Sequence, residues 1–168
     1  MSSSDGYNLK TLTNSETDKG TFNINVKDTI TLDLSGRTIQ HKQTVVSSVY
    51  SSSLTVKNAE LNSDLINNLS GEGLILQESE VKGQLKNQGQ MVLEDSEIDG
   101  QITNNYGTMT ILGDFVIQNG ITSAGYSAQY NTINIGNASN SATVISSTTI
   151  SDQTIVISNG SLIMNNDG

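Results

Sequence analysis

Acidic side chains recur at matched places in three copies of one sequence pattern. One position of the pattern holds Glu60, Glu80 and Glu97, and the position two residues earlier holds Glu78 and Asp95. If the copies stack, neighbouring carboxylates lie about 5 Å apart and repel by roughly 1 kcal/mol in water. Either a bridging Ca²⁺, which prefers oxygen ligands, or solvation and screening by salt would relieve this repulsion. Calcium is therefore one of two interpretations, and we expect no other cofactor.

The chain is poor in the residues that polysaccharide lyases and hydrolases use. Such enzymes need clustered aspartates together with an arginine or lysine side chain and often a histidine. This chain has one arginine, Arg37, and one histidine, His41, four residues apart, and it lacks a paired-aspartate motif. A capping or ion-pairing role suits Arg37 better than a catalytic one. We therefore predict that the protein is not an enzyme and has no catalytic residues.

Two tyrosines, Tyr126 and Tyr130, lie in an insertion rich in Ser, Gly and Asn. The step from Met109 to Ile133 spans 24 residues, whereas the preceding step from Met91 spans 18. Insertions in repeat proteins map to protruding loops, and tyrosines in such loops can stack on sugar rings. The alternative is an ordinary loop whose tyrosines pack back on the body. Tyr126 and Tyr130 are our candidate ligand-binding residues.

These residues must be positioned by a repeat, which aligns without gaps over residues 54–67, 74–87 and 91–104. Apolar residues occupy its first, third, eighth and twelfth positions, a small residue the sixth, and asparagine the fourteenth. The shared positions hold Leu54, Leu74 and Met91; Val56, Leu76 and Leu93; Ala59, Ser79 and Ser96; Leu61, Val81 and Ile98; Leu65, Leu85 and Ile102; and Asn67, Asn87 and Asn104. Weaker copies begin at Leu32 (with Leu34 and Ile39), Met109 (with Val116), Ile133 and Ile155 (with Leu162), so seven copies are countable.

The pattern predicts short strands with one buried face, separated by polar corners. A single copy cannot bury its apolar face, but stacked copies can, and stacking also pairs the backbone groups. We therefore predict an all-β fold, a right-handed parallel β-helix of about seven rungs. Residues 21–168 would form it, after a cap or tail over residues 1–20. The recurring asparagines should hydrogen-bond one another at an inner corner. A left-handed coil, the closest rival, would show stricter six-residue spacing.

Two segments resemble a known family. Residues 29–39, TITLDLSGRTI, resemble the opening coil of pectin-lyase-like right-handed β-helices in bacterial surface and adhesin proteins. Residues 102–111, ITNNYGTMTI, resemble a recurrent coil of that family. The short rungs around Val81 and Ile98 also resemble bactofilins, which are cytoplasmic β-helical filament proteins. The resemblance implies the fold, but that fold carries lyases, hydrolases, adhesins and inert stalks alike.

Charge and hydropathy limit the partners. The net charge of −9 disfavours nucleic acids and anionic lipid, and no apolar run approaches the ~18 residues that span a membrane. Residues 1–6 lack the features of a signal peptide, so the chain is either cytoplasmic or a segment of a longer protein. The abrupt end at residues 166–168 favours the segment.

We accordingly expect a non-catalytic extracellular or cell-surface module that contacts host or cell-wall glycan or protein. One alternative is a self-assembling scaffold or filament subunit, cytoplasmic in location, whose exposed strand edges pair end to end. Another is a fragment of a polysaccharide lyase or hydrolase.

Overall fold

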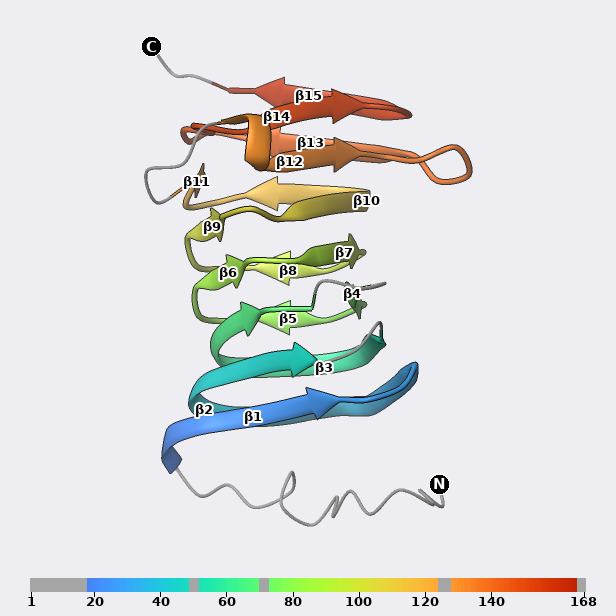
Figure 1. The fold of residues 1–168 in the computed structure, drawn as a ribbon. Helices are drawn as coiled ribbons and strands as arrows, with labels where there is room; N and C mark the ends of the chain where they lie inside the picture. Colours follow the sequence, from blue (N-terminus) through green and yellow to red (C-terminus); the bar gives the residue numbers. More distant parts are fainter. Residues whose placement is uncertain (1–17, 49–51, 70–72, 124–127, 166–168) are drawn as a thin grey trace.

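The computed structural model of the chain describes residues 18–48, 52–69, 73–123 and 128–165. They form a right-handed parallel β-solenoid of about seven turns, as predicted, with the N-terminal coil at one end and the C-terminal coil at the other (Figure 1). The elements are β1 (Asp18–Val26), β2 (Ile30–Ser48), β3 (Ser53–Asn67), β4 (Gly73–Gln77), β5 (Glu80–Val81), β6 (Leu85–Asn87), β7 (Gln90–Glu94), β8 (Glu97–Ile98), β9 (Ile102–Asn104), β10 (Thr108–Ile117), β11 (Ile121–Thr122), a 3₁₀ turn (Ala128–Tyr130), β12 (Thr132–Ile135), β13 (Ala142–Ser146), β14 (Thr154–Ile157) and β15 (Gly160–Met164).

Each central rung contains three short strands, which lie on three faces of the rod. One rung runs through β4, β5 and β6, and the next through β7, β8 and β9; every pairing between rungs is parallel. Buried and solvent-facing side chains alternate in β6, and in β4 from Leu74 onward, as the two-residue period of a strand requires. No described helix is long and apolar enough to cross a membrane.

The core consists of aliphatic columns that run along the rod. The column begun by the first apolar position of the repeat passes through residues that are all at most 2% exposed: Leu54, Leu74, Met91, Met109 and Ile133. Each of these side chains lies over its equivalent in the next rung, so the predicted stacking is confirmed. Full burial of an aliphatic side chain of this size is worth about 1.5–3 kcal/mol.

A hydrogen-bonded asparagine ladder closes one inner corner, as predicted. Asn67 Nδ2 donates to Asn87 Oδ1, and Asn87 Nδ2 donates to Asn104 Oδ1, both at 2.8 Å. All three side chains are completely buried. Asn67 Oδ1 also accepts from the N–H of Leu69, so the ladder satisfies corner backbone groups that no strand can pair.

Glycine corners allow successive rungs to approach closely between β5 and β6 and between β8 and β9. A Cβ on Gly100 would lie 2.3 Å from the carbonyl oxygen of Gly83, and one on Gly83 would lie 2.5 Å from that of Ser63. No other residue fits such a column without moving the backbone.

The first rung begins two residues earlier than the sequence pattern suggested. Ile30 and Leu32 pair with Leu54 and Val56, whereas the repeat placed Leu32 opposite Leu54. The register shifts between Asp33 and Arg37, where β2 contains additional residues at a bulge. Repeat matching without gaps could not detect this insertion.

The placement of Val116 in the core was wrong. Val116 is 53% exposed, whereas Phe115 and Ile117 are buried. In the two preceding rungs a buried serine follows the corner residue, but here the exposed Asp114 follows Gly113. Because side chains alternate along a strand, this inversion at Asp114 turns every later side chain of β10 to the opposite face.

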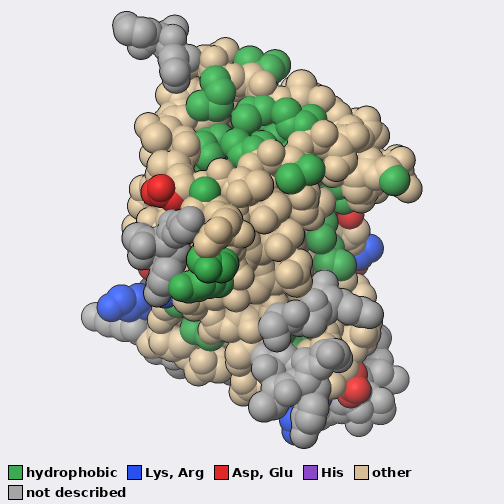
Figure 2. All heavy atoms as spheres, turned by 45° about the horizontal axis from the view of Figure 1, so that its top comes forward, with side chains coloured by type: hydrophobic (Ala, Val, Ile, Leu, Met, Phe, Trp, Pro, Cys, Tyr) green, Lys and Arg blue, Asp and Glu red, His purple; other side chains and the backbone are tan. Residues whose placement is uncertain are grey.

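The last described rung of the rod exposes apolar side chains. Ile155 and Ile157 continue the core columns of β12, yet they are 37% and 51% exposed. Ile163 and Met164 of β15 are also more than 40% exposed. Figure 2 shows apolar side chains gathered where this end comes forward.

Candidate functional site

Left-handed corner residues position one row of acidic side chains. Asn58, Glu78 and Asp95 have φ of 50°, 47° and 46°, and Gly113 takes the same corner with φ of 77°. Asn, Asp and Gly adopt this conformation readily, whereas glutamate does so rarely. The corner repeats because its N–H groups bond the neighbouring rung: Glu78 donates to the Glu94 carbonyl at 3.1 Å.

A buried serine column follows these corners and explains the small residue in the repeat. The N–H of Ala59 donates to Ser79 Oγ, and the N–H of Ser79 donates to Ser96 Oγ, both at 3.2 Å. Each serine hydroxyl in turn donates to a backbone carbonyl of its own rung, that of Gln77 or Glu94. These serines are therefore fully used in holding the corners.

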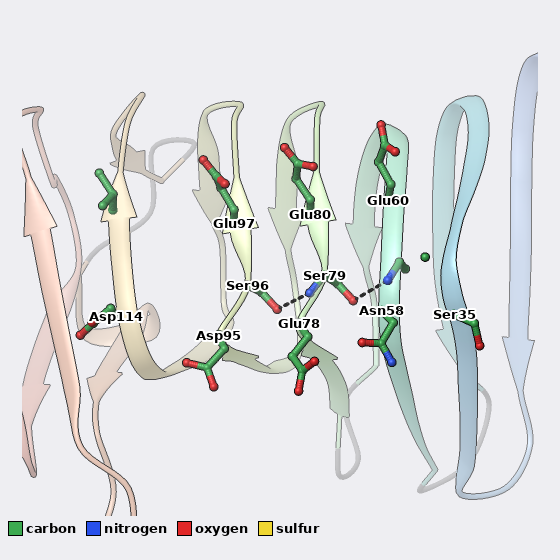
Figure 3. A pocket seen from close by; sticks show the side chains of 13 residues that line it. Ser35, Asn58, Glu60, Glu78, Ser79, Glu80, Asp95, Ser96, Glu97 and Asp114 are labelled. Carbon is green, nitrogen blue, oxygen red and sulfur yellow. Dashed lines mark hydrogen bonds between the residues drawn. The ribbon is translucent and has the colours of Figure 1, made fainter.

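An open groove of about 900 Å³ runs along the rod above this serine column. Glu60, Glu80 and Glu97 form one side of it, and Glu78 and Asp95 form the other (Figure 3). The first row comes from β3, β5 and β8, whose pairing places the three glutamates at one register position. The acidic column inferred from the repeat is thus present, with a second acidic row on the other side of the serine column.

Charge in the first row is partly compensated by neighbouring side chains. Lys82 Nζ forms an ion pair with Glu80 and lies 3.6 Å from Asp99 Oδ2. Gln118 Nε2 donates to Glu97 Oε1 at 2.9 Å. Thr38 Oγ1 donates to the carboxylate of Glu60 at 3.2 Å.

The structure groups three carboxylates closely enough to share a cation. Oxygens of Glu80, Glu97 and Asp99 lie within 4.8 Å of one another. Glu60, Glu78 and Asp95, the other predicted metal ligands, do not belong to this group. A Ca²⁺ ion takes six to eight oxygens and would compete here with the ammonium of Lys82. Calcium binding therefore remains a prediction.

Asp99 was missed, although the repeat contained a signal for it. Lys82 and Asp99 occupy the same repeat position one rung apart, in the corners Val81-Lys-Gly and Ile98-Asp-Gly. A lysine and an aspartate in one column predict an ion pair between rungs. An alignment based on the apolar positions alone does not reveal this ion pair.

A second acidic corner lies in the first rung, at Asp33. Its pKa is lowered from the ordinary 3.8, first by the hydrogen bond from Asn58 Nδ2 and then by that from the Ser35 N–H. These donors stabilise the charged carboxylate. The positive charge of Lys57 acts in the same direction.

Tyr130 forms an exposed aromatic pair with Tyr106. The ring centroids are 5.5 Å apart, the rings are tilted by 41°, and the two residues are 53% and 54% exposed. Tyr126 lies outside the described residues. Tyr106 was missed, although the corner from Asn104 to Gly107 holds one residue more than its counterpart in the preceding rung.

Asn131 fixes the backbone beneath this pair. Its buried Oδ1 accepts from the N–H of Tyr106 at 2.8 Å, and its Nδ2 donates to the Asp152 carbonyl at 2.9 Å. Tyr106 has φ of 53°, so its corner is a left-handed turn. Asn131 thereby ties three successive rungs together directly below the tyrosines.

Arg37 and His41, the one arginine and the one histidine, both lie in β2. The His41 ring stacks on the ring of Phe22 in β1, with centroids 5.0 Å apart and planes within 7°. Arg37 is exposed beside the bulge of the first rung. The stacking of His41 joins the two N-terminal strands.

Fold and site together define a parallel β-solenoid with an acidic groove along one side and an exposed aromatic pair. In comparisons with known proteins, no protein-family model, curated protein or solved structure matches this chain. The structure thus establishes the solenoid class.

Proposed function

We propose that this chain is a non-catalytic module of a bacterial surface protein, which presents the tyrosine pair to glycan. The observation that carries the proposal is the Tyr106–Tyr130 pair, two half-exposed rings in contact on a regular rod. An aromatic face can pack on the C–H face of a sugar ring while the phenol hydroxyl remains available for hydrogen bonds.

Rigid support favours binding by this pair. The turn that carries Tyr106 is held by Asn131, and the Ala128 carbonyl of the 3₁₀ turn accepts from Thr154 Oγ1 at 2.9 Å. A ligand would therefore meet rings on an ordered backbone, and little conformational entropy would be lost on binding. The net charge of −9 favours neutral or basic glycans over acidic ones.

The resemblance of residues 29–39 to adhesin β-helices supports an extracellular location, within a longer surface protein. It also leaves the fragment of a lyase or hydrolase as a rival. Release of unsaturated or reducing sugar from polysaccharide by the purified chain would contradict the non-catalytic proposal.

A glycan array tests the proposal directly. The wild-type protein should retain at least one neutral glycan, and Tyr106→Ala and Tyr130→Ala should each weaken that binding by about tenfold, because each removes one stacking face. Tyr130→Phe keeps the ring and should retain most of the affinity.

Val116→Ala is the matched control. It truncates a residue as exposed as Tyr130, at 53%, but within β10 beside the acidic groove. If the wild type binds no glycan, or if binding survives the loss of both tyrosines, the proposal that the tyrosine pair binds glycan is wrong.

A further inference from the structure

Tyr106, Tyr130 and Asp152 occupy one corner position in three successive rungs. The strands β10, β12 and β14 each begin two residues after this position, and their first residues pair across the rungs. Tyr106 and Asp152 have φ of 53° and 56°, so both are left-handed corner residues. Asn131 bonds both corners, since it accepts from the Tyr106 N–H and donates to the Asp152 carbonyl. The tyrosine pair therefore continues into a carboxylate along the rod.

Side chains at this corner lie on the side of the rod. Tyr106 and Tyr130 are 54% and 53% exposed, although their rungs have paired strands both before and after them. Asp152 is exposed as well, while its carbonyl faces back toward Asn131. Exposure is thus a property of this corner, and it holds for rungs in the interior of the rod.

Asp152 gives the corner a negative charge. It is the one charged side chain of the three corner segments, residues 104–108, 128–132 and 150–154. An ammonium group is attracted both by the face of an aromatic ring and by a carboxylate that accepts its hydrogen bond. A carboxylate in line with two tyrosines therefore offers a cationic ligand two favourable contacts, whereas a neutral sugar uses the rings alone.

We propose that the column formed by Tyr106, Tyr130 and Asp152 binds glycans of amino sugars whose amines are free. This inference rests on the proposed glycan-binding function and names its class of ligand. Successive corners are about 4.8 Å apart, so a linear glycan that follows the rod can meet both rings and the carboxylate in order. The ammonium group of one sugar would lie against Asp152, and the sugars would pack on the tyrosines.

The shape of the column favours sugar rings over the flexible side chains of a basic peptide. The rings of Tyr106 and Tyr130 are tilted by 41° instead of stacked flat, and each remains about half exposed. Each ring can therefore pack against the C–H face of a sugar. The backbone that carries them is held by Asn131, so these faces keep a fixed spacing.

Isothermal titration calorimetry at mildly acidic pH, with two matched glycans, tests the proposal. Linear glucosamine oligomers carry a free amine on every ring, and fully N-acetylated oligomers of the same length carry none. The wild type should bind the amine-bearing oligomer about tenfold more tightly, because only this oligomer can donate charged hydrogen bonds to Asp152. Raised salt should reduce the preference by screening the charges.

Asp152→Asn removes the charge and keeps a residue type that adopts the left-handed conformation readily. It should bring the affinities for the two oligomers close to each other. Asp114→Asn is the matched control, since it removes the same charge from an exposed position in β10, and it should keep the preference of the wild type. Equal effects of the two substitutions would assign the preference to the net charge of the protein and overturn the proposal.

The remaining outcomes separate this inference from the glycan-binding function. Equal binding of both oligomers that is lost in Tyr106→Ala and Tyr130→Ala would overturn the preference for amines and leave glycan binding by the tyrosines in place. A preference for the amine that survives both tyrosine substitutions would overturn the role of the column. A lysine oligopeptide is the third probe, and an affinity equal to that of the glucosamine oligomer would overturn the assignment to amino sugars.

Discussion

Asn67 Nδ2 donates a 2.8 Å hydrogen bond to Asn87 Oδ1 in the rung above, and both side chains are wholly buried. Asn87 repeats the same donation to Asn104. A polar column thus lies inside an otherwise apolar rod. Each such hydrogen bond contributes little net free energy to folding. Removing one partner alone is costly, because the other partner is then buried without a hydrogen bond.

Asn87→Ala should therefore destabilise the protein by about 3 kcal/mol, because it leaves the amide of Asn67 and the N–H of Gly89 without their buried acceptor. Urea unfolding followed by circular dichroism measures the change. Asn134→Ala is the control, since Asn134 is only half-buried and makes one long bond, 3.4 Å, to Thr110. Similar losses of unfolding free energy in the two variants would show that the buried ladder stabilises the protein no more than an ordinary surface hydrogen bond.

Leu76→Ala should cost about 3 kcal/mol, because the side chain is 0% exposed and close-packed in its column. Ile157→Ala, in the last described rung of the same column, should cost less than about 1 kcal/mol in dilute protein, since Ile157 is already 51% exposed. Urea midpoints with unchanged slopes measure both. A costly Ile157→Ala in monomeric protein would mean that the end of the rod is covered.

Lys82→Met should lower the melting temperature by about 1–3 °C at low salt, because it leaves Glu80, Glu97 and Asp99 without their cation. High salt should shrink the difference by screening. Calcium should stabilise Lys82→Met more than the wild type, because the ion no longer competes with the ammonium group.

Lys86→Met is the control, since it removes the same charge from β6, outside the three-carboxylate group. A calcium response of equal size in all three proteins would remove the case for a site at Glu80, Glu97 and Asp99.

Asp33→Asn should lower the melting temperature near neutral pH. The pKa of Asp33 is depressed in the folded protein, so its contribution to stability is present above the unfolded value of 3.8 and is lost as the pH falls through the lower folded value. The melting curves of the wild type and Asp33→Asn should therefore converge in strong acid. Asp28→Asn, which changes an exposed carboxylate outside this turn, is the control. A difference that persists below the folded pKa would contradict the assigned cause.

The regular part of this fold was predictable because its side-chain identities repeat. Leu76 and Leu93, at matched positions, both lie in the core, and the recurring asparagines form the expected ladder. The bulge before Arg37 and the inversion after Gly113 were not predictable from repeat matching without gaps. Two added residues at the bulge shift the register of β2, and the added residue Asp114 exchanges the buried and exposed faces of the rest of β10. The partnership of Tyr106 with Tyr130 was hidden for a related reason, since it joins residues 24 positions apart through an irregular rung.

The stacked corners at Gly83 and Gly100 have a consequence for size. Residues 84–100 form one complete circuit of the rod, and their removal would join Gly83 to Gln101 and set Ile102 over Leu65, where Leu85 now lies. The cross-section would stay the same while the molecule became shorter by one strand spacing. The length of the rod can therefore be changed by deleting or duplicating whole circuits, without any change to the packing of its interior.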